Sequence, residues 1–458
     1  MFQIFHTNDV HSEFEALASL QTVLVNQRGE DDLLLDAGDF HDFKSILLQG
    51  TQGRAGKRIL SAMNYDVVAI GNNEGYSSVP NLEAMSEDEV PLLSCNLVRL
   101  NGEELPFIRK SCIIHKCNHR FLVIGVSPYY ALDGSDSYNV FFALDDLKVL
   151  GPVNRIKSEI KVHQGAYDFI ILLSHLGLSF DQQIATKIPE LDIIIGGHSH
   201  SKLEKPLIIH DCVIHQAGAY AQSLGRMTFD IQDGQLILLD SQTIEIKATP
   251  DPDLLDLLAK EQSHAIKVLS EPLLNNHALD FDPIHENRLM NFLCDALVKH
   301  HPCDFALINH GIISHALPDP ITTLSLIEAC PSPLNPSLLR LKGRQIKRAY
   351  QQSLDLEYCM RSGRGPGFRG TFIGALTFSQ AIRIQDDRIL LNEQELEDDR
   401  IYQVMSSDYL QRGTAYPSLT IPDEETIFLR GYIRDVLLEH LHDESLHESS
   451  KIKRKVKL

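Results

Sequence analysis

The sequence has no long apolar run, no excess of basic residues and no closely spaced cysteines, and each absence argues against a class of protein. No stretch approaches the roughly 20 apolar residues that a membrane-spanning helix needs, so we expect no membrane association. The formal net charge of −20 argues against binding to nucleic acid or to an anionic membrane surface, because both require a cationic face. The eight cysteines are scattered without a Cys-x-x-Cys pair, which predicts reduced thiols.

The beginning of the sequence also lacks the basic and apolar segments of a secretory signal peptide, and we therefore expect a cytoplasmic protein. Hydrophobic residues make up 43% of the chain and charged residues 23%, a balance typical of a globular protein. At 458 residues the chain exceeds what one hydrophobic core usually supports, so two domains are the simplest expectation.

Short apolar runs alternate with helical patterns over the first 200 residues, which predicts a layered α/β domain. The predicted strands are residues 2–5, 33–35, 67–70, 92–94, 122–126, 169–173 and 193–195, and the predicted helices include residues 14–26, 57–63 and 147–162. Antiparallel strands around the hairpin signal Asp233-Gly234 close this domain, and a proline-rich break at residues 250–252 precedes a helix. These patterns predict a first domain at 1–245, a connector helix at 246–272, a second domain at 273–445 and a basic tail at 446–458, with residues 451–458 frayed.

Five short segments place oxygen or imidazole groups directly after apolar runs, where predicted strands end and loops begin. They are residues 6–11 (HTNDVH), 38–39 (GD), 71–74 (GNNE), 174–175 (SH) and 196–200 (GGHSH). Each of these residues alone has an ordinary alternative, such as a capping histidine or an aspartate that starts a turn. Their co-occurrence in this order predicts a site for two metal ions.

The chemistry of phosphate transfer explains why such residues would gather. Hydrolysis of a stable phosphate ester needs a strong nucleophile and neutralised phosphate oxygens, and two divalent cations about 3.5 to 4 Å apart provide both. A carboxylate must bridge the pair, and Asp39, which follows a predicted strand and the small Ala37 and Gly38, is the predicted bridge.

The remaining ligands follow from strand geometry. If the chain stays extended, Asp9 and His11 point to one side. The same holds for His198 and His200, while His175 and the carbonyl oxygen of Asn72 would fill the remaining positions. Mixed nitrogen and oxygen ligands suit zinc, manganese, iron, cobalt or nickel and suit calcium poorly.

The order of these motifs resembles the calcineurin-like metallophosphoesterase superfamily. The opening His6-Thr7-Asn8-Asp9 and the second domain are similar to its 5′-nucleotidase and UDP-sugar hydrolase branch, of the cytosolic bacterial type. The resemblance implies a four-layer α/β/β/α sandwich followed by a smaller α+β substrate domain. It also implies that Asp9, His11, Asp39 and His200 hold the first metal, and that Asp39, Asn72, His175 and His198 hold the second.

The second domain resembles the same branch more weakly. Asn309 and Gly311 match a substrate-binding Asn-x-Gly segment, and Tyr409 matches an aromatic residue that stacks on the nucleobase. Phe368, in a Gly-Phe-Arg-Gly turn, is a second candidate for stacking, and the alternative for Tyr409 is a half-buried core aromatic. The sequence departs from the branch at Thr414, where an aspartate would bind the ribose.

The sequence also departs from the family at the general acid. The usual Gly-Asn-His-Glu reads Gly-Asn-Asn-Glu here, so Asn73 replaces the histidine, and Tyr76 replaces its aspartate partner. An amide can orient a phosphate by a hydrogen bond but cannot deliver a proton, and general acid catalysis is typically worth about 10² to 10⁴-fold in rate.

The sequence therefore predicts a metal-dependent phosphohydrolase in which a metal-bridging hydroxide attacks a nucleotide or a related phosphate ester or anhydride. Asp39 and Asn73 are its predicted catalytic residues, its partner is a small-molecule nucleotide, and no oligomeric state is predicted. Three alternatives remain. The substrate is a diester or anhydride that needs no general acid, His41 or His310 replaces the missing acid, or the protein is a catalytically weakened nucleotide sensor.

Overall fold

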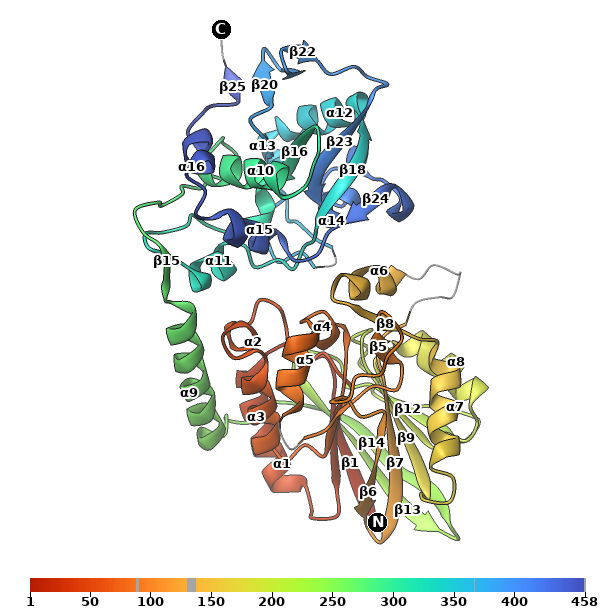
Figure 1. The fold of residues 1–458 in the computed structure, drawn as a ribbon. Helices are drawn as coiled ribbons and strands as arrows, with labels where there is room; N and C mark the ends of the chain where they lie inside the picture. The colour runs from red at the N-terminus through yellow and green to blue at the C-terminus, as the bar shows by residue number, and fades with distance from the viewer. Residues whose placement is uncertain (88–89, 130–136, 366, 457–458) are drawn as a thin grey trace. The chain divides into compact units, whose positions relative to one another are not determined.

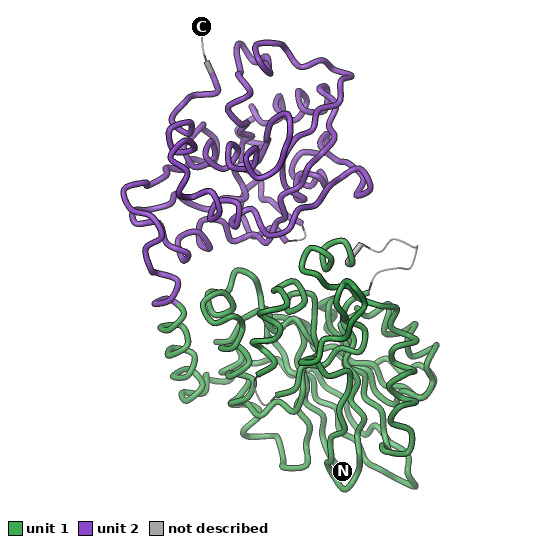
Figure 2. Tube along the Cα trace, in the orientation of Figure 1, with its two compact units in different colours: residues 1–265 green, residues 266–458 purple. Residues whose placement is uncertain are grey.

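The computed structural model describes residues 1–87, 90–129, 137–365 and 367–456, and the chain forms two compact units, residues 1–265 and 266–458 (Figure 2). The boundary falls within helix α9 (Pro252–Leu269), in the segment expected to connect two domains. None of the described helices combines the length and the apolarity needed to cross a membrane.

Unit 1 is built on two six-stranded mixed sheets (Figure 1). The first sheet has the order β14 (Gln235–Glu245), β13 (Ser223–Gln232), β1 (Phe2–Thr7), β2 (Leu33–Asp36), β3 (Val67–Ala69) and β4 (Leu92–Leu93). The second has the order β11 (Leu207–Ile209), β12 (Cys212–His215), β10 (Ile193–Gly196), β9 (Phe169–Ser174), β7 (His119–Val126) and β6 (Ser111–Lys116). A small pair, β5 (Leu97–Arg99) and β8 (Leu147–Val149), lies outside them.

Alternate side chains of each central strand point to opposite faces of its sheet. One face packs against the other sheet and the opposite face packs against helices, so unit 1 has four layers. Ile4 of β1 packs between the two sheets, whereas Phe5 packs against the helices on the outer face of the first sheet. Likewise Ile171 of β9 packs between the sheets, whereas Ile170 faces the helices on the second sheet. The predicted four-layer sandwich is therefore confirmed. Its helices are α1 (Phe14–Gln27), α2 (Ile46–Thr51), α3 (Arg54–Ala62), α4 (Asn72–Gly75), α5 (Val79–Ser86), α6 (Ser137–Leu144), α7 (Pro152–Val162) and α8 (Leu178–Lys187).

Parallel pairing brings the carboxyl ends of the central strands to one edge. Strands β1, β2, β3 and β4 run parallel in the first sheet, and β7, β9, β10 and β12 run parallel in the second. The loops that follow β1 and β2 are also bonded to each other, since Asp9 N donates to Gly38 O at 2.9 Å and His11 N donates to Asp39 O at 2.9 Å. This edge therefore collects the predicted ligand segments.

Unit 2 is a smaller α+β domain around one continuous hydrophobic core, as predicted. Its main sheet has the order β19 (Leu376–Phe378), β16 (Phe305–Asn309), β23 (Ile401–Ser407), β18 (Pro336–Lys342) and β24 (Thr426–Phe428). Helix α10 (Arg288–His300) packs against β16, β19 and β23. The other helices are α11 (Thr323–Ala329), α12 (Gly343–Ser353), α13 (Leu356–Cys359), α14 (Asp408–Gln411), α15 (Ile433–His440) and α16 (Glu444–Ser450). A two-stranded sheet pairs β15 (Pro272–Leu274) with β17 (Ile321–Thr322). A four-stranded sheet has the order β22 (Gln394–Glu395), β21 (Arg388–Leu391), β20 (Ile382–Gln385) and β25 (Lys455–Val456).

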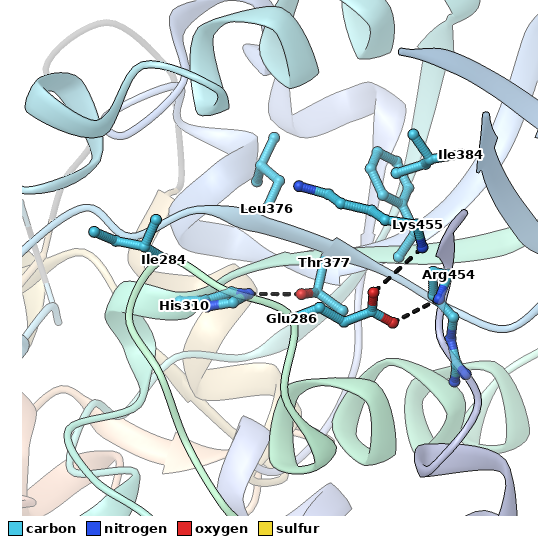
Figure 3. Close-up of a pocket in the computed structure, with 9 residues that line it drawn as sticks. Ile284, Glu286, His310, Leu376, Thr377, Ile384, Arg454 and Lys455 are labelled. Carbon is cyan, nitrogen blue, oxygen red and sulfur yellow. Dashed lines mark hydrogen bonds between the residues drawn. The ribbon is translucent and has the colours of Figure 1, made fainter. Parts of the chain in front are cut away.

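The basic tail differs from the frayed segment that the sequence predicts. Strand β25 pairs with β20, and the buried Arg454 guanidinium donates to Asp295 of α10 at 2.6 Å. Glu286 accepts hydrogen bonds from the backbone nitrogens of Arg454 and Lys455 at 2.6 and 3.2 Å (Figure 3). A buried carboxylate on α10 thus needs the cation of the tail, whereas residues 457–458 lie outside the described part of the chain.

Candidate metal centre

Five of the predicted ligands have a left-handed backbone conformation instead of the extended conformation of a strand. Asp9, His11, Asp39, His198 and His200 have φ values of 52°, 50°, 56°, 72° and 50°. Residues other than glycine rarely adopt this left-handed region, and such strain concentrates at functional sites. The prediction that strand alternation pairs the side chains of Asp9 and His11 is therefore wrong. Tight turns group them instead.

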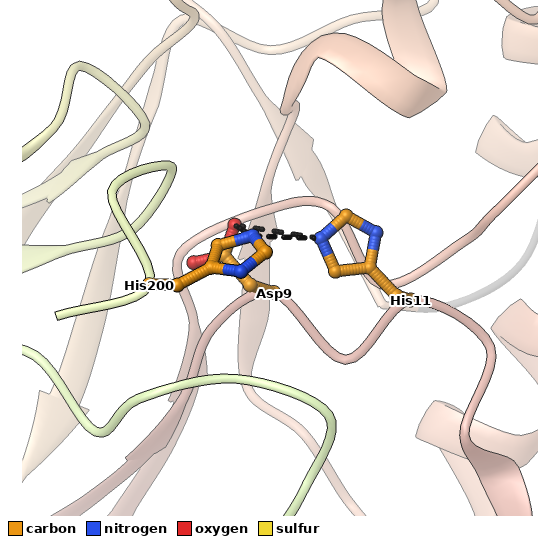
Figure 4. Close-up of side chains that lie close together, drawn as sticks. All are labelled: Asp9, His11 and His200. Atoms are coloured by element: carbon orange, nitrogen blue, oxygen red, sulfur yellow. Dashed lines mark hydrogen bonds and ion pairs between the residues drawn. The ribbon is translucent and has the colours of Figure 1, made fainter. Parts of the chain in front are cut away.

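Two groups of possible metal ligands share Asp9. The first contains Asp9, His11 and His200 (Figure 4). Within it, His11 Nε2 lies 3.0 Å from His200 Nε2, and His200 Nε2 lies 3.4 Å from Asp9 Oδ1. The second contains Asp9, Asp39 and His175, with His175 Nε2 3.8 Å from Asp9 Oδ1 and 3.4 Å from Asp39 Oδ2. Because Asp39 Oδ2 also lies 4.0 Å from His11 Nε2, both carboxylates face both groups.

These distances suit divalent metal ions. Two atoms that bind one ion at about 2.1 Å lie about 3.0 to 3.4 Å apart for octahedral or tetrahedral angles. Nε2 of His175 is buried and has no hydrogen-bond partner among the residues that the structure describes, whereas its Nδ1 donates to Ala37 O at 2.7 Å. This arrangement directs the free lone pair of Nε2 toward the two carboxylates, as in metal-bound histidines.

The electrostatics agree with a site built for cations. Asp9 and Asp39 are buried, and within the described residues their ion-pair partners are histidines. Burial alone would raise the pKa of Asp39 and lower that of His175, but their mutual attraction lowers the pKa of Asp39 and raises that of His175. Burial and the charge of His175 lower the pKa of His198 to about 4, which keeps this imidazole neutral and able to bind a metal.

Glu74 holds the two ligand loops of the first sheet together. Its buried carboxylate accepts hydrogen bonds from the backbone nitrogens of Asp39 and Gly71 at 2.9 Å each, and from that of His41 at 3.0 Å. Gly71 lies so close to Asp39 that a Cβ there would meet Asp39 Oδ1 at 2.1 Å. Asp39 thus explains two positions of the Gly-Asn-x-Glu motif. Gly71 must lack a side chain to fit against Asp39, and Glu74, three residues later, accepts the hydrogen bond of the Asp39 backbone.

Asn72 and His198 lie beside the two groups and contact each other. Asn72 Oδ1 is 2.9 Å from His198 Nδ1, and the backbone nitrogen of His198 donates to both oxygens of Asp9, at 3.1 and 2.9 Å. The carbonyl oxygen of Asn72, which was expected as a ligand, accepts a hydrogen bond from Tyr76 N at 2.8 Å in the short helix α4. The side-chain oxygen is the atom that faces His198.

Asn73 contacts a proposed ligand. Its side chain is 4% exposed, and its amide nitrogen donates to His41 O at 2.7 Å and lies 3.0 Å from His11 Nδ1. Its backbone nitrogen donates to Asp39 Oδ1 at 2.8 Å. Tyr76, in place of the family's aspartate, packs its ring 4.6 Å from that of Phe142. Neither residue replaces the lost pair as a proton donor.

The two histidines considered as replacement acids are buried and neutral. His41 lies 3.0 Å from Gly53 O through Nε2, and burial lowers its pKa to about 4. His310 lies between Asp282 O at 2.7 Å and Thr377 Oγ1 at 2.6 Å (Figure 3), and burial lowers its pKa to about 4 as well. Neither imidazole is in the charged imidazolium form at neutral pH, which is the form a general acid needs.

Sequence reasoning missed two residues beside the centre. Asp42 Oδ2 lies 3.7 Å from His11 Nδ1, and Asp42 is buried. The ring of Tyr220 lies 5.4 Å from the rings of both His11 and His200, and Tyr220 is 42% exposed. No sequence motif marks either residue, although Asp42 follows the predicted bridge Asp39 by only three positions.

The four predicted substrate residues gather in one part of unit 2. The rings of Phe368 and Tyr409 stack on each other, with centroids 4.4 Å apart and planes 12° apart, and both are buried. Asn309 donates to Ile373 O at 2.7 Å. A Cβ at Gly370 would meet both the carbonyl oxygen of Gly311 and the ring of Phe368, so these residues are neighbours. Tyr409 is therefore more deeply buried than either sequence interpretation expected.

Comparison with known proteins covers both units. Residues 2–202 match the family model for calcineurin-like phosphoesterases, and residues 266–419 match that for the 5′-nucleotidase C-terminal domain. The chain is 27% identical to the Bacillus subtilis metallophosphoesterase YunD over 95% of this chain and 98% of that protein. It is 25% identical to the 5′-nucleotidase of Rattus norvegicus, over 90% and 82% of the two chains. The structure of Haemophilus influenzae NAD nucleotidase has the same fold, with a TM-score of 0.63, 16% identity and coverage of 100% and 97%.

Proposed function

Because this chain belongs to the calcineurin-like phosphoesterases that carry a 5′-nucleotidase C-terminal domain, we propose that it hydrolyses nucleotides or related phosphate esters and anhydrides with the help of two divalent metal ions. The observation that carries the proposal is the pair of ligand groups that share Asp9 at the edge where the parallel strands end. Cysteines support a reducing, cytoplasmic location, since all eight are unpaired.

We assign each metal ligand to the ion that the family resemblance implies for it. Asp9, His11, Asp39 and His200 would hold one ion, and Asp39, Asn72, His175 and His198 the other. When bound, such ions acidify a water molecule and neutralise charge on the phosphate oxygens. Zinc, manganese, iron, cobalt or nickel fits these nitrogen and oxygen donors.

The residues around the ligands have separate tasks in this proposal. Glu74 fixes the loops that present Asp39 and Asn72, through three backbone hydrogen bonds. Asn73 holds His11 in place through its amide nitrogen, which would have to release His41 O or His11 Nδ1 to orient a phosphate oxygen. The leaving group must then depart without a proton from the position of Asn73. This favours leaving groups of low pKa, as in phosphoanhydrides and aryl esters, over the alcohol of a nucleoside monophosphate.

We assign the first 245 residues to catalysis and residues 273–445 to recognition of the nucleoside, with residues 246–272 as the connector. In unit 2, Phe368 and Tyr409 already form an aromatic stack. A nucleobase could enter only by replacing this contact, which is worth about 0.5 to 1.5 kcal/mol. Stacking of a base on an aromatic side chain is worth about 1 to 3 kcal/mol, which would offset the loss of this contact. Asn309 and Gly311 would then line the same region.

A substrate panel tests the proposal. The full-length protein, loaded in turn with Mn²⁺, Zn²⁺ and Co²⁺, should release phosphate from an aryl phosphate and from at least one nucleotide. The Asp39→Asn variant should lose this activity and about one metal ion per chain while keeping its circular dichroism spectrum, because the change is nearly isosteric. Wild-type protein that binds nucleotide and metal but turns over no phosphate compound would instead support the sensor alternative.

A further inference from the structure

We propose that unit 2 carries a separate site for a late first-row divalent ion such as Zn²⁺, built from His300, Glu439 and His440. His300 is the last residue of α10, and Glu439 and His440 are the last two residues of α15. One possible ligand atom from each residue lies within 4.8 Å of those of the other two. His300 Nδ1 is 3.1 Å from Glu439 Oε2, and the two imidazole rings lie 6.0 Å apart at 89°.

The imidazole nitrogens in this cluster have unused bonding capacity. Within the described residues, the buried His440 Nε2 has no hydrogen-bond partner, and the buried His300 Nδ1 makes no well-aligned hydrogen bond although Glu439 Oε2 lies 3.1 Å away. Buried polar atoms are normally satisfied, and an unsatisfied one costs stability. Burial lowers the pKa of His440 although the nearby carboxylates of Glu439 and Asp443 raise it, so this ring is neutral at pH 7 and able to donate a lone pair.

The local charge favours a cation at this place. Both α10 and α15 end here, and the free carbonyl groups at a helix C-terminus carry partial negative charge. The neighbouring cation, Lys299, is already engaged by Asp443 and by Ser445 at 3.0 Å. The positive charge of Lys299 is thereby balanced before any ion binds to the histidines.

The donor set selects the kind of ion. Two imidazoles and one carboxylate suit Zn²⁺, Ni²⁺, Cu²⁺ or Co²⁺, whereas Mg²⁺ and Ca²⁺ prefer oxygen ligands only. The side chain of Glu439 is 59% exposed, so the ion can exchange with solvent and water can complete its coordination. A bound ion would tie the end of α15 to the end of α10. It would stabilise unit 2 progressively as the free metal concentration exceeds the dissociation constant.

The test measures Zn²⁺ bound per full-length chain by equilibrium dialysis against buffered Zn²⁺. The His300→Gln, His440→Gln and Glu439→Gln variants should each lower the affinity of one bound ion at least tenfold, with the remaining ions unchanged. The matched control is His442→Gln, an exposed histidine two positions beyond His440, which should bind as the wild type does. Mg²⁺ in place of Zn²⁺ should show no binding that depends on these residues.

Hydrolysis measured under saturating metal should be the same in all these variants, because none of the three residues is among the proposed catalytic ligands. Zn²⁺ binding by a folded His300→Gln/His440→Gln double variant that equals the wild type in number and affinity would overturn the proposal. If the double variant does not fold, the Zn²⁺ affinity of the Glu439→Gln variant, whose substitution is at an exposed position, decides the question. An unchanged affinity for every bound ion in that variant would overturn the proposal. These outcomes do not depend on whether the protein hydrolyses nucleotides.

Discussion

Asp42 presents its Oδ2 atom 3.7 Å from Nδ1 of His11, the ring nitrogen opposite the Nε2 that faces Asp9 and His200. At this distance the Asp42 carboxylate acts on the His11 ring through its charge, whereas Nδ1 lies 3.0 Å from the amide nitrogen of Asn73. Both residues are buried, so this interaction is little screened by solvent. Asp42 is therefore placed to orient His11 for metal binding.

We expect Asp42→Asn to weaken metal binding about 10- to 100-fold, which is typical for loss of a carboxylate that supports a histidine ligand. Metal titration by calorimetry would measure the loss directly, and activity should return at high metal concentration. Asp32→Asn is a suitable control, because Asp32 is also buried but bonds to the backbone nitrogens of Gln3 and Gly29. An Asp42→Asn protein with unchanged metal affinity would contradict the role.

Gly71→Ala should remove metal-dependent activity, because its Cβ would meet Asp39 Oδ1 at 2.1 Å and push this ligand out of place. Metal content and phosphate release should fall together, and raising the metal concentration should restore neither. Gly29→Ala is the matched control, because its Cβ would make only an ordinary contact, 3.4 Å from Asp32 Oδ2. If Gly71→Ala kept more than a tenth of the wild-type rate, the tight fit around Asp39 would not matter for catalysis.

The gathering of the proposed ligand residues could be predicted because each follows a buried strand, and parallel strands end at one edge of a sheet. The reason given for pairing Asp9 with His11 was nevertheless wrong, since a positive φ at both residues replaces the extended chain. Asp42 and Tyr220 carry no local signal. They reach the centre only because turns after β2 and β12 bring distant segments of the sequence together.

Three other differences arise from contacts between distant segments of the sequence. The helix predicted over residues 147–162 is divided, because Leu147–Val149 pairs with β5 and Pro152 begins the helix α7. A helical pattern does not reveal strand pairing with a distant segment. The packing of Arg454 on Asp295, and the contact between Phe368 and Tyr409, are likewise tertiary contacts between residues far apart in the sequence.

Loss of the general acid at Asn73 should make the rate depend steeply on the leaving group. We expect an aryl phosphate or a phosphoanhydride to react about 10² to 10⁴-fold faster than a nucleoside 5′-monophosphate, the range that general acid catalysis supplies. Asn73→His should narrow this difference, although Tyr76 leaves the new imidazole without an orienting carboxylate. Asn73→Gln, which restores no proton, should not narrow it. Equal kcat/KM values for both substrate classes in the wild type would show that another acid is present.

Stacking of a base in unit 2 predicts a selective effect on KM. Tyr409→Leu removes the ring but keeps an apolar side chain at a buried position, so the domain should fold. KM for a nucleotide should rise about 5- to 100-fold, in line with about 1 to 3 kcal/mol of stacking, while KM for a small aryl phosphate should hardly change. Phe368→Leu should act in the same direction. A similar rise for both substrates would assign Tyr409 to packing alone.

The buried His310 should make the stability of unit 2 depend on pH. Its folded-state pKa is about 4, against about 6.5 in an unfolded chain, because burial disfavours the charged ring. Between these values the unfolded chain binds a proton that the folded chain does not, so stability is complete above pH 6.5 and falls as the pH is lowered toward 4. The full effect is on the order of 3 kcal/mol.

Hydrogen exchange of the β16 amides should report this loss of stability, and His310→Gln should flatten the pH dependence relative to the wild type, because glutamine does not titrate. Equal pH dependence in the two proteins would mean that other groups, such as the buried His447, control the acid sensitivity of this unit.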